Sequence, residues 1–424
     1  MDRTEQLFDI FKRSKGVTID TRTISGGEIF FALKGENSDG NIFSASALEK
    51  GALCAVVDDQ KYAVNENYFL VEDGLIALQQ LAKKYRSTFD FPVLALTGSN
   101  GKTTTKELIR SVLAQKFNVQ ATKGNLNNHI GVPLTILSIA SDCNFAIIEM
   151  GANHQKEIES YCQYADPAFG LITNIGKAHL EGFGGEEGVL KGKSELFQYV
   201  MQRGGPVFYS SGQNKLQSVV DNYVNAFTYG FWENDFVSGK IISGRTFATV
   251  SVEGVMMESN LVGDYNADNI LAAVCVGKYF HLSLQEIATG IAQYFPDNNR
   301  SELRTINGNH FILDAYNANP SSMKVAIENL QKQTAVFKIA ILGDMLELGE
   351  YAHREHGAVL EQARSAGFQL LVTVGPEFGK FKYPEVIHFE NSTDAQSWWK
   401  SQSYKDATIL LKGSRGIKLE KIIN

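Results

Sequence analysis

The chain has 424 residues, 44% of them hydrophobic and 21% charged, and its formal net charge at pH 7 is -7. This length exceeds what one hydrophobic core usually serves, so two or three domains are expected, and the composition is typical of a globular protein. The charge excludes the basic excess of a general nucleic-acid binder, and no apolar run approaches the roughly 18 residues of a membrane span. The first residues contain no apolar segment typical of a signal peptide. We therefore expect a cytoplasmic protein with no nucleic-acid partner and no membrane insertion. A monomer is the expected state, although nothing in the sequence indicates the oligomeric state.

The four cysteines are Cys54, Cys143, Cys162 and Cys275, which are widely spaced and form no CxxC pair. Zinc sites and disulfide frameworks normally show closer or repeated spacing. We interpret these residues as reduced thiols of the core.

The first part of the chain predicts a small α/β domain over residues 1–86. Short apolar runs at 27–33 and 52–57 are typical of strands, and residues 74–85 have helical apolar spacing. The segment 87–92 then interrupts the pattern and contains Pro92. We place the first domain boundary there.

A second series predicts a central domain over residues 87–298. Its elements are a strand at 93–96, a helix at 103–116, and strands at 145–148 and 170–173. Such alternation of strands and helices favours a mostly parallel sheet covered by helices. A more irregular stretch at 205–263, with a strand at 246–252, and a helix at 269–276 extend this domain.

The third series begins after residues 296–299 and covers 299–424. Apolar strands are predicted at 311–313, 338–342, 370–374 and 408–411, with helical segments between them. This pattern is typical of a second doubly wound unit. The fold class is therefore α/β, with three domains.

The strongest local signal is the glycine turn between the strand at 93–96 and the helix that follows it. Gly98 and Gly101 let the backbone approach a phosphate chain, Lys102 can neutralise phosphates, and Thr103 can offer a hydroxyl to Mg²⁺. The strict P-loop pattern has a glycine where this chain has Leu96. The strand and helix on either side nevertheless favour nucleotide binding over an ordinary glycine turn.

Three further residues are candidates for chemistry, each with a plainer alternative. Glu149 ends an apolar strand, where a carboxylate beside phosphates suits a Mg²⁺ ligand, although it could also be a capping or solvated glutamate. His179 also follows a strand and could bind a metal or orient a substrate, or be an ordinary histidine. Lys193, taken alone, would be a solvated helix lysine.

Several motifs in order resemble the Mur ligase family over essentially the whole chain. The segments that carry this resemblance are 97–105, 124–133, 149–154 and 178–184. A second set is similar to the family branch that adds D-alanyl-D-alanine; its segments are 19–22, 30–35, 39–40, 314–320, 342–349 and 412–414.

The resemblance implies a function for each domain. The small N-terminal α/β domain would hold the UDP end of the substrate, and the central P-loop domain with its mostly parallel sheet would bind ATP. The C-terminal Rossmann-like domain would bring the incoming dipeptide. The implied reaction joins D-alanyl-D-alanine to UDP-N-acetylmuramoyl-tripeptide through an acyl phosphate, with ATP and two Mg²⁺ ions.

The resemblance also assigns individual residues. The implied catalytic residues are Lys102, His179 and Lys193, and the implied metal ligands are Thr103, Glu149, His179 and Lys193. The ATP-binding set is Gly98, Ser99, Asn100, Gly101, Lys102, Thr103, Thr104, Asn266, Asn269, Arg300 and Asp314. The UDP-substrate set is Thr21, Arg22, Lys34, Gly35, Asn127 and Asn128, and the dipeptide set is Tyr316, Asn317, Asn319, Lys412 and Ser414.

Some of the residue roles implied by the resemblance have alternatives. In the family, a lysine in the setting of Lys193 is carbamylated and helps to hold Mg²⁺; Lys191 is the competing candidate here. Tyr265 replaces the usual histidine near the adenine, which leaves that contact open. Arg300 and Asp314 could instead form an interdomain salt bridge and a strand-end carboxylate.

Two other functions remain open from the sequence. A sister ligase of the folylpolyglutamate or diaminopimelate type would add a single amino acid, and would differ in its N-terminal domain or in the acceptor motif of the third. A nucleotide-dependent switch or binding module would hold ATP and release no phosphate with any acceptor.

Overall fold

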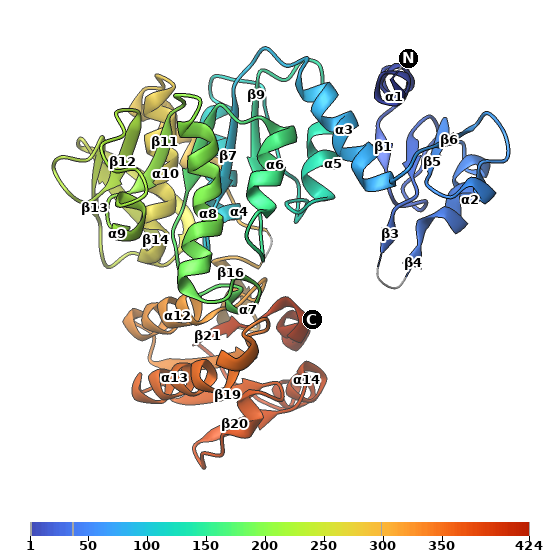
Figure 1. Ribbon diagram of the computed structural model, residues 1–424. Helices are drawn as coiled ribbons and strands as arrows, with labels where there is room; N and C mark the ends of the chain where they lie inside the picture. Colours follow the sequence, from blue (N-terminus) through green and yellow to red (C-terminus); the bar gives the residue numbers. More distant parts are fainter. Residues whose placement is uncertain (1, 36–37, 298, 424) are drawn as a thin grey trace.

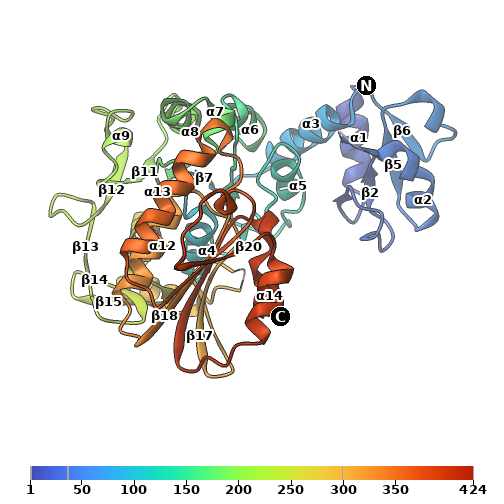
Figure 2. The same ribbon diagram turned by 90° about the horizontal axis from the view of Figure 1, so that it is seen from below.

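A computed structural model describes residues 2–35, 38–297 and 299–423. The chain forms three domains, each built on its own sheet (Figure 1). The N-terminal domain projects to one side of the central domain, and the C-terminal domain packs on another side of it (Figures 1 and 2). The α/β fold with three domains is confirmed. The predicted boundary at residue 298 lies outside the described residues.

The N-terminal domain contains a parallel sheet in the order β1-β2-β5-β6 and a small hairpin of β3 and β4. Its strands are β1 (Val17–Thr18), β2 (Ile29–Phe31), β3 (Lys34–Gly35), β4 (Ser38–Asp39), β5 (Cys54–Val57) and β6 (Tyr68–Leu70), and its helices are α1 (Arg3–Phe11), α2 (Ser44–Glu49) and α3 (Gly74–Arg86). The strands predicted at 27–33 and 52–57 and the helix at 74–85 are present. Helix α3 packs against α5 and α6 of the central domain and joins the two domains.

The central sheet has the order β15-β14-β13-β12-β11-β10-β7-β9-β8 and is parallel from β8 to β13. Its strands are β7 (Val93–Thr97), β8 (Val119–Ala121), β9 (Phe145–Glu149), β10 (Phe169–Ile172), β11 (Val207–Ser210), β12 (Ala226–Gly230), β13 (Val237–Ile241), β14 (Phe247–Val252) and β15 (Val255–Val262). Strands β13, β14 and β15 are antiparallel, so the irregular stretch of the sequence forms one end of this sheet. The mostly parallel sheet is confirmed.

Helices cover both faces of the central sheet. They are α4 (Lys102–Leu113), α5 (Gly131–Leu137), α6 (Glu157–Ala165), α7 (Leu180–Phe183), α8 (Glu186–Met201), α9 (Asn214–Gln217), α10 (Ala267–Tyr279) and α11 (Leu284–Gln293). Strand β9 illustrates why two covers are needed: Ala146 and Ile148 enter one core cluster, while Phe145 and Ile147 enter the other. Because side chains alternate along a strand, an apolar run of this kind buries both faces of the sheet.

The C-terminal sheet has the order β16-β17-β21-β18-β19-β20, with only β16 antiparallel among its described strands. Its strands are β16 (Glu302–Ile306), β17 (Asn309–Asp314), β18 (Phe337–Gly343), β19 (Leu370–Val374), β20 (Val386–Phe389) and β21 (Ala407–Lys412), and its helices are α12 (Pro320–Lys332), α13 (Ala352–Ser365) and α14 (Ser392–Lys400). The four predicted strands are present. Strands β16 and β20 were not predicted, because these edge strands carry weak apolar patterns.

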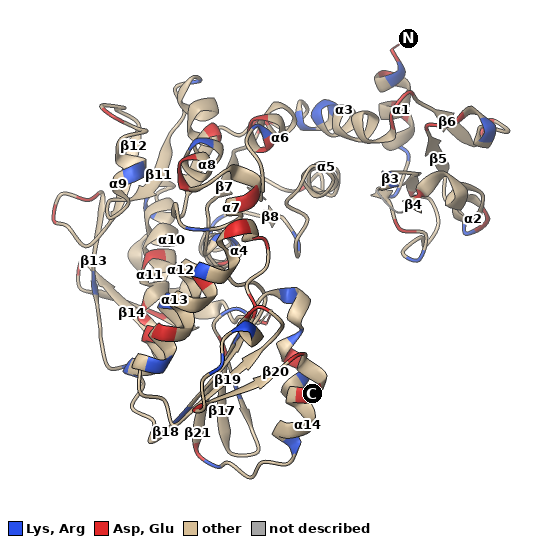
Figure 3. Ribbon diagram, turned by 60° about the horizontal axis from the view of Figure 1, so that its bottom comes forward, with Lys and Arg blue, Asp and Glu red and all other residues tan. Residues whose placement is uncertain are grey.

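Lysines and arginines are interspersed with acidic residues over the three domains (Figure 3). The four cysteines are free and buried, as expected for core thiols. Among the helices of residues 2–35, 38–297 and 299–423, none combines the length and apolar character needed to cross a membrane.

Candidate active site

The glycine loop between β7 and α4 is closely packed at both of its glycines. Gly98 has φ 146° and Gly101 has φ 79°, a region that L side chains rarely adopt. A Cβ at Gly98 would lie 2.0 Å from Thr173 Oγ1, and one at Gly101 would lie 2.5 Å from Asn269 Oδ1. Both backbone conformation and close approach therefore require glycine at these positions.

The same loop is fixed by the end of the neighbouring strand β10. Thr173 Oγ1 donates to the Asn100 carbonyl at 2.6 Å, and the Asn100 N–H donates to Asn174 Oδ1 at 3.0 Å. The Gly176 N–H donates to Ser99 Oγ at 2.8 Å. These bonds hold the backbone of the glycine loop in one shape. Sequence reasoning missed the roles of Thr173 and Asn174, although their position at the end of the strand predicted at 170–173 was an available signal.

Helix α4 begins at Lys102 and brings a cation and a hydroxyl to the loop. Lys102 Nζ donates to the Gly98 carbonyl at 2.7 Å. Its side chain is partly exposed, but desolvation of the ammonium lowers the pKa of Lys102, with a smaller lowering from Arg300. Thr103 Oγ1 donates to both carboxylate oxygens of Glu149, at 2.9 and 3.1 Å. The neighbouring Thr104 is buried. The structure thus brings the predicted phosphate cation, hydroxyl and carboxylate together.

The carboxylate of Glu149 suits Mg²⁺ by its chemistry and surroundings. Glu149 is buried, and Asn127 Nδ2 donates to its Oε1 at 2.8 Å. In residues 2–35, 38–297 and 299–423, no three His, Cys, Asp or Glu side chains form a group that could hold a metal. Mg²⁺ is usually held by one or two carboxylates, with phosphate and water oxygens completing its shell. Thr103 and Glu149 therefore fit a metal that arrives with a nucleotide.

Lys193 lies inside the protein on α8, so the reading of it as a solvated lysine is wrong. Its side chain is 1% exposed, its Nζ donates to the Ala152 carbonyl at 3.0 Å, and it lies 5.0 Å from the centre of the Phe183 ring. Desolvation, together with the charge of Lys102, holds the pKa of Lys193 well below its usual value. The competing Lys191 is exposed on the same helix.

His179 precedes α7 and has a left-handed backbone conformation, with φ 52°. Its Nδ1 contacts the carboxylate of Glu347 in the C-terminal domain. This contact lowers the pKa of Glu347. No local sequence pattern indicates this partner, because the two residues belong to different domains.

The asparagines predicted at the adenine lie beside the glycine loop. Asn269 Nδ2 donates to Asn266 Oδ1 at 2.8 Å, and Asn269 Oδ1 accepts from Thr105 Oγ1 at 3.0 Å. Tyr265, which stands where the family has a histidine, forms a hydroxyl contact with Ser301 at 2.7 Å. Burial raises the pKa of Tyr265. The tyrosine hydroxyl therefore faces the start of the C-terminal domain.

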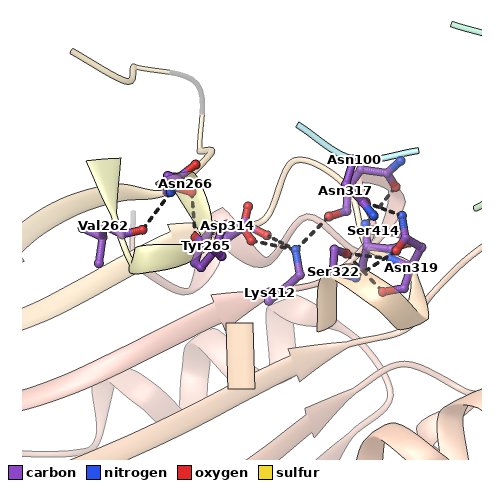
Figure 4. A network of polar contacts seen from close by, with 12 residues as sticks. Asn100, Val262, Tyr265, Asn266, Asp314, Asn317, Asn319, Ser322, Lys412 and Ser414 are labelled. Atoms are coloured by element: carbon purple, nitrogen blue, oxygen red, sulfur yellow. Dashed lines mark hydrogen bonds and ion pairs between the residues drawn. The ribbon is translucent and has the colours of Figure 1, made fainter. Parts of the chain in front are cut away.

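Arg300 and Asp314 lie where the C-terminal domain meets this site. The Arg300 guanidinium is 3.6 Å from the centre of the Tyr316 ring. Lys412, 1% exposed, donates to Asp314 Oδ2 at 2.7 Å and to the Asn317 carbonyl at 3.3 Å. Figure 4 shows Asp314, Lys412 and Asn317 next to one another. The buried lysine thus fixes the turn that follows β17.

Asn319 connects this turn to the glycine loop. Its Oδ1 accepts from the Ser322 N–H at 2.9 Å and caps α12, while its Nδ2 donates to Asn100 Oδ1 at 2.7 Å (Figure 4). Ser414 Oγ accepts from the Leu346 N–H at 2.9 Å. Both side chains, predicted to bind the dipeptide, thus make contacts within the protein.

The residues predicted for the UDP substrate lie in two places. Thr21, Arg22, Lys34 and Gly35 belong to the N-terminal domain, whereas Asn127 and Asn128 precede α5 of the central domain. Arg22 binds Asp20 at 2.6 Å, and its hydrogen bond lowers the pKa of Asp20 to about 2. Lys34 pairs with Asp58 at 2.9 Å.

Residues of both groups make further hydrogen bonds within the protein. The Thr21 carbonyl accepts from Lys50 Nζ at 3.0 Å, and Asn128 Oδ1 accepts from the Gly131 N–H at 2.8 Å. Asn127 lies with the Glu149 group, and not with the N-terminal residues. The structure thus does not bring the six residues into one cluster of contacts.

Fold and site define the class of this protein: a three-domain α/β protein with a P-loop at a domain interface. Comparison with protein families gives three matches, which together span most of the chain. Residues 13–86 match the Mur ligase family catalytic domain, 96–277 the Mur ligase middle domain, and 299–415 the Mur ligase glutamate ligase domain. The chain belongs to the Mur ligase family.

Individual relatives agree with these matches. The chain is 34% identical to the UDP-N-acetylmuramoyl-tripeptide D-alanyl-D-alanine ligase of Bacillus subtilis (strain 168), covering 96% of this chain and 92% of that protein. The structure is similar to a crystal structure of MurF from Acinetobacter baumannii, with a TM-score of 0.88, 28% identity and coverage of 99% and 97%. It is also similar to MurF ligase from Thermotoga maritima in complex with ADP, with a TM-score of 0.85, 26% identity and coverage of 98% and 97%.

Proposed function

We propose that the protein is an ATP-dependent ligase that joins D-alanyl-D-alanine to UDP-N-acetylmuramoyl-tripeptide. The observation that carries this proposal is the contact of the phosphate loop with the C-terminal domain through Asn100 and Asn319. A ligase must bring its activated acid and its amine together, and this contact joins the two domains at the phosphate loop. Family membership and the ligase activity for which the similar Bacillus subtilis protein is named support the choice of substrates.

Each domain has one part in the proposed reaction. Residues 1–86 hold the UDP end of the tripeptide substrate through Thr21, Arg22, Lys34 and Gly35. Residues 87–298 bind ATP, and residues 299–424 bring the dipeptide. The exposed side chains of Arg22 and Lys34 in the N-terminal domain and the glycine loop of the central domain support this division. A cytoplasmic, monomeric protein fits the proposed substrates, which need no nucleic acid or membrane.

In the proposed reaction, the tripeptide carboxylate attacks the γ-phosphate of ATP and gives an acyl phosphate and ADP. The dipeptide amine then attacks the acyl carbon, loses a proton and displaces phosphate. Lys102 and Arg300 offset charge on the transferring phosphoryl group, while the N–H groups in the first turn of α4 hold the phosphate chain. Asn266, Asn269 and Asp314 orient the nucleoside. Catalysis then consists mainly of positioning and charge stabilisation.

Mg²⁺ would be held by Thr103 and Glu149, with His179 and a carbamylated Lys193 serving a second ion. The metal supplies a positive charge that polarises the phosphoryl oxygens. A carbamate forms only from a neutral amine, and the burial of Lys193 together with the charge of Lys102 favours the neutral form. Carbamylation replaces an ammonium, which repels a cation, by oxygen ligands.

The decisive experiment measures phosphate release with ATP, Mg²⁺, UDP-N-acetylmuramoyl-tripeptide and D-alanyl-D-alanine, omitting each in turn, and identifies the amide product by mass spectrometry. Turnover should require all four. L-alanine, D-glutamate and lysine should fail, because a site that pairs with the second amide and carboxylate of the dipeptide leaves polar groups unpaired with a single residue. Equal turnover with one amino acid would make the protein a sister ligase, and no phosphate release would make it a nucleotide-binding module.

A further inference from the structure

Lys106 is a fully buried lysine beneath the candidate active site. It lies on α4, one helical turn after Lys102 and Thr103, and its side chain is 0% exposed. Burial of an ammonium group is costly unless the group is paired and hydrogen-bonded. The contacts of Lys106 therefore indicate its role in the protein.

The ammonium of Lys106 binds one carbonyl and lies beside two carboxylates. Its Nζ donates to the Thr122 carbonyl at 2.5 Å, and it lies 2.9 Å from Glu107 Oε1 and 3.8 Å from Glu149 Oε2. Thr122 Oγ1 in turn accepts from the Glu149 N–H at 2.9 Å. One lysine thus fixes the chain after β8 and faces the carboxylate at the end of β9.

Glu149 consequently has a cation on one side and the Thr103 hydroxyl on another. The Thr103 hydroxyl and the Asn127 amide both donate to this carboxylate, so its position is set by three side chains. A divalent ion at Glu149 would be repelled by the buried ammonium a few ångströms away, and burial keeps this repulsion unscreened by salt.

We propose that Lys106 is a positioning residue that acts as an internal counter-ion of Glu149. It holds the carboxylate in place and opposes divalent cation binding until nucleotide phosphates add negative oxygen ligands. Metal and nucleotide thereby bind together, and Glu149 alone attracts little metal. This inference rests on the proposed role of Glu149 as a Mg²⁺ ligand.

The test measures binding of Mn²⁺, which accepts the same oxygen ligands, to the nucleotide-free protein by electron paramagnetic resonance of the free ion. Lys106→Met should increase the Mn²⁺ affinity at least about tenfold, because it removes the repelling charge at similar side-chain volume. Lys116→Met, which removes an exposed charge just beyond the end of α4, should leave the affinity unchanged. The double variant Lys106→Met/Glu149→Gln should lose the gained binding.

A lysine that only filled space would give the opposite result, since its loss would loosen the site and weaken Mn²⁺ binding. Unchanged or weaker binding in Lys106→Met therefore overturns the proposal. If that variant does not fold, Glu107→Gln carries the test: it leaves the ammonium less neutralised and should weaken Mn²⁺ binding in the presence of ADP at least about threefold. An unchanged affinity in Glu107→Gln would contradict the counter-ion role.

The ligation assay of the parent protein separates this inference from the proposed function. A parent that ligates D-alanyl-D-alanine while Lys106→Met shows no gain in Mn²⁺ affinity overturns the role of Lys106 alone. The opposite outcome is also possible: the parent shows no ligation, but Lys106→Met gains Mn²⁺ binding that depends on Glu149. This result would overturn the proposed ligase function and support the counter-ion role of Lys106.

Discussion

Lys102 occupies the first position of α4 and reaches back over the glycine loop to the Gly98 carbonyl. In the proposed complex it would exchange that carbonyl for phosphate oxygens. Its ammonium is available for this exchange because it donates to carbonyls of the glycine loop, whereas the Lys106 ammonium also pairs with two carboxylates.

The first prediction is that Lys102→Ala lowers kcat/KM for ATP at least about a hundredfold, because the charge that stabilises the transferring phosphoryl group is lost. The thermal melt should change little, since this side chain is partly exposed and not part of the core. Steady-state phosphate release and a melting curve check both outcomes. Normal turnover in a folded variant would contradict the nucleotide site.

Lys193 provides the second residue-scale prediction. Lys193→Ala should lose roughly a hundredfold in activity, because the metal loses an oxygen ligand, and should recover part of it with acetate and Mg²⁺. Labelling of the parent with ¹³C-bicarbonate should give a carbamate carbon signal that is absent from the variant. Exposed Lys191 is a matched control on the same helix, and Lys191→Ala should behave like the parent. Full activity of Lys193→Ala would exclude the carbamate.

At the scale of elements, the N-terminus of α12 joins a helix cap to an interdomain contact. Asn319 and Ser322 form a capping box, in which the Asn319 N–H donates to Ser322 Oγ at 3.1 Å. Only Asn319 also reaches Asn100 on the phosphate loop. Substitutions of the two residues therefore separate the effect of the helix cap from the effect of the interdomain hydrogen bond between Asn319 and Asn100.

The third prediction is that Asn319→Ala destabilises the protein by about 1 kcal/mol through loss of the cap. It should also lower kcat roughly fivefold, the value of one hydrogen bond that positions the phosphate loop. Ser322→Ala weakens the same cap and keeps the hydrogen bond between Asn319 and Asn100, so its kcat should remain near that of the parent. Denaturant unfolding and steady-state kinetics measure the two effects. Equal losses of kcat in both variants would show that the hydrogen bond between Asn319 and Asn100 has no separate role.

At the scale of the whole molecule, the C-terminal domain is held on the central domain by several polar contacts. Lys177 pairs with Glu355 at 3.2 Å, its N–H donates to Ser321 Oγ at 3.1 Å, and His179 contacts Glu347. These are polar and partly exposed contacts, which favour relative domain motion over a permanent interface. Substrate entry and product release would then require the two domains to move apart.

The fourth prediction concerns an engineered disulfide that would hold this interface closed. An ideal Cβ at Gly176 would lie 3.5 Å from Ser321 Cβ, within the range of disulfide geometry. The double variant Gly176→Cys/Ser321→Cys should form a disulfide that abolishes turnover under oxidising conditions, and a reductant should restore it. The native cysteines are buried and should not compete. Each single cysteine variant serves as control for the substitution itself. Undiminished turnover with a complete disulfide, measured by thiol counting, would show that opening is not needed.

The sequence by itself determined the class of fold and the phosphate loop. Apolar alternation and helical spacing are local properties, so the strands at 93–96 and 145–148 and the helix after the loop followed from the order of residues alone. Helix α4 nevertheless ends at Leu113, three residues before the predicted end at Lys116, because helix ends depend on capping contacts. The glycines at 98 and 101 were recognisable because backbone geometry restricts which residues fit.

The tertiary structure decided which side chains meet and which are buried. Lys106 and Lys193 look like ordinary helix lysines in sequence, and only the packing of helices on the sheet shows that both are excluded from water. The contacts of Asn100 with Asn319 and of His179 with Glu347 join residues far apart in the chain. Local patterns record the conformation that each segment prefers, whereas burial and ion pairing depend on which surfaces the whole chain brings together.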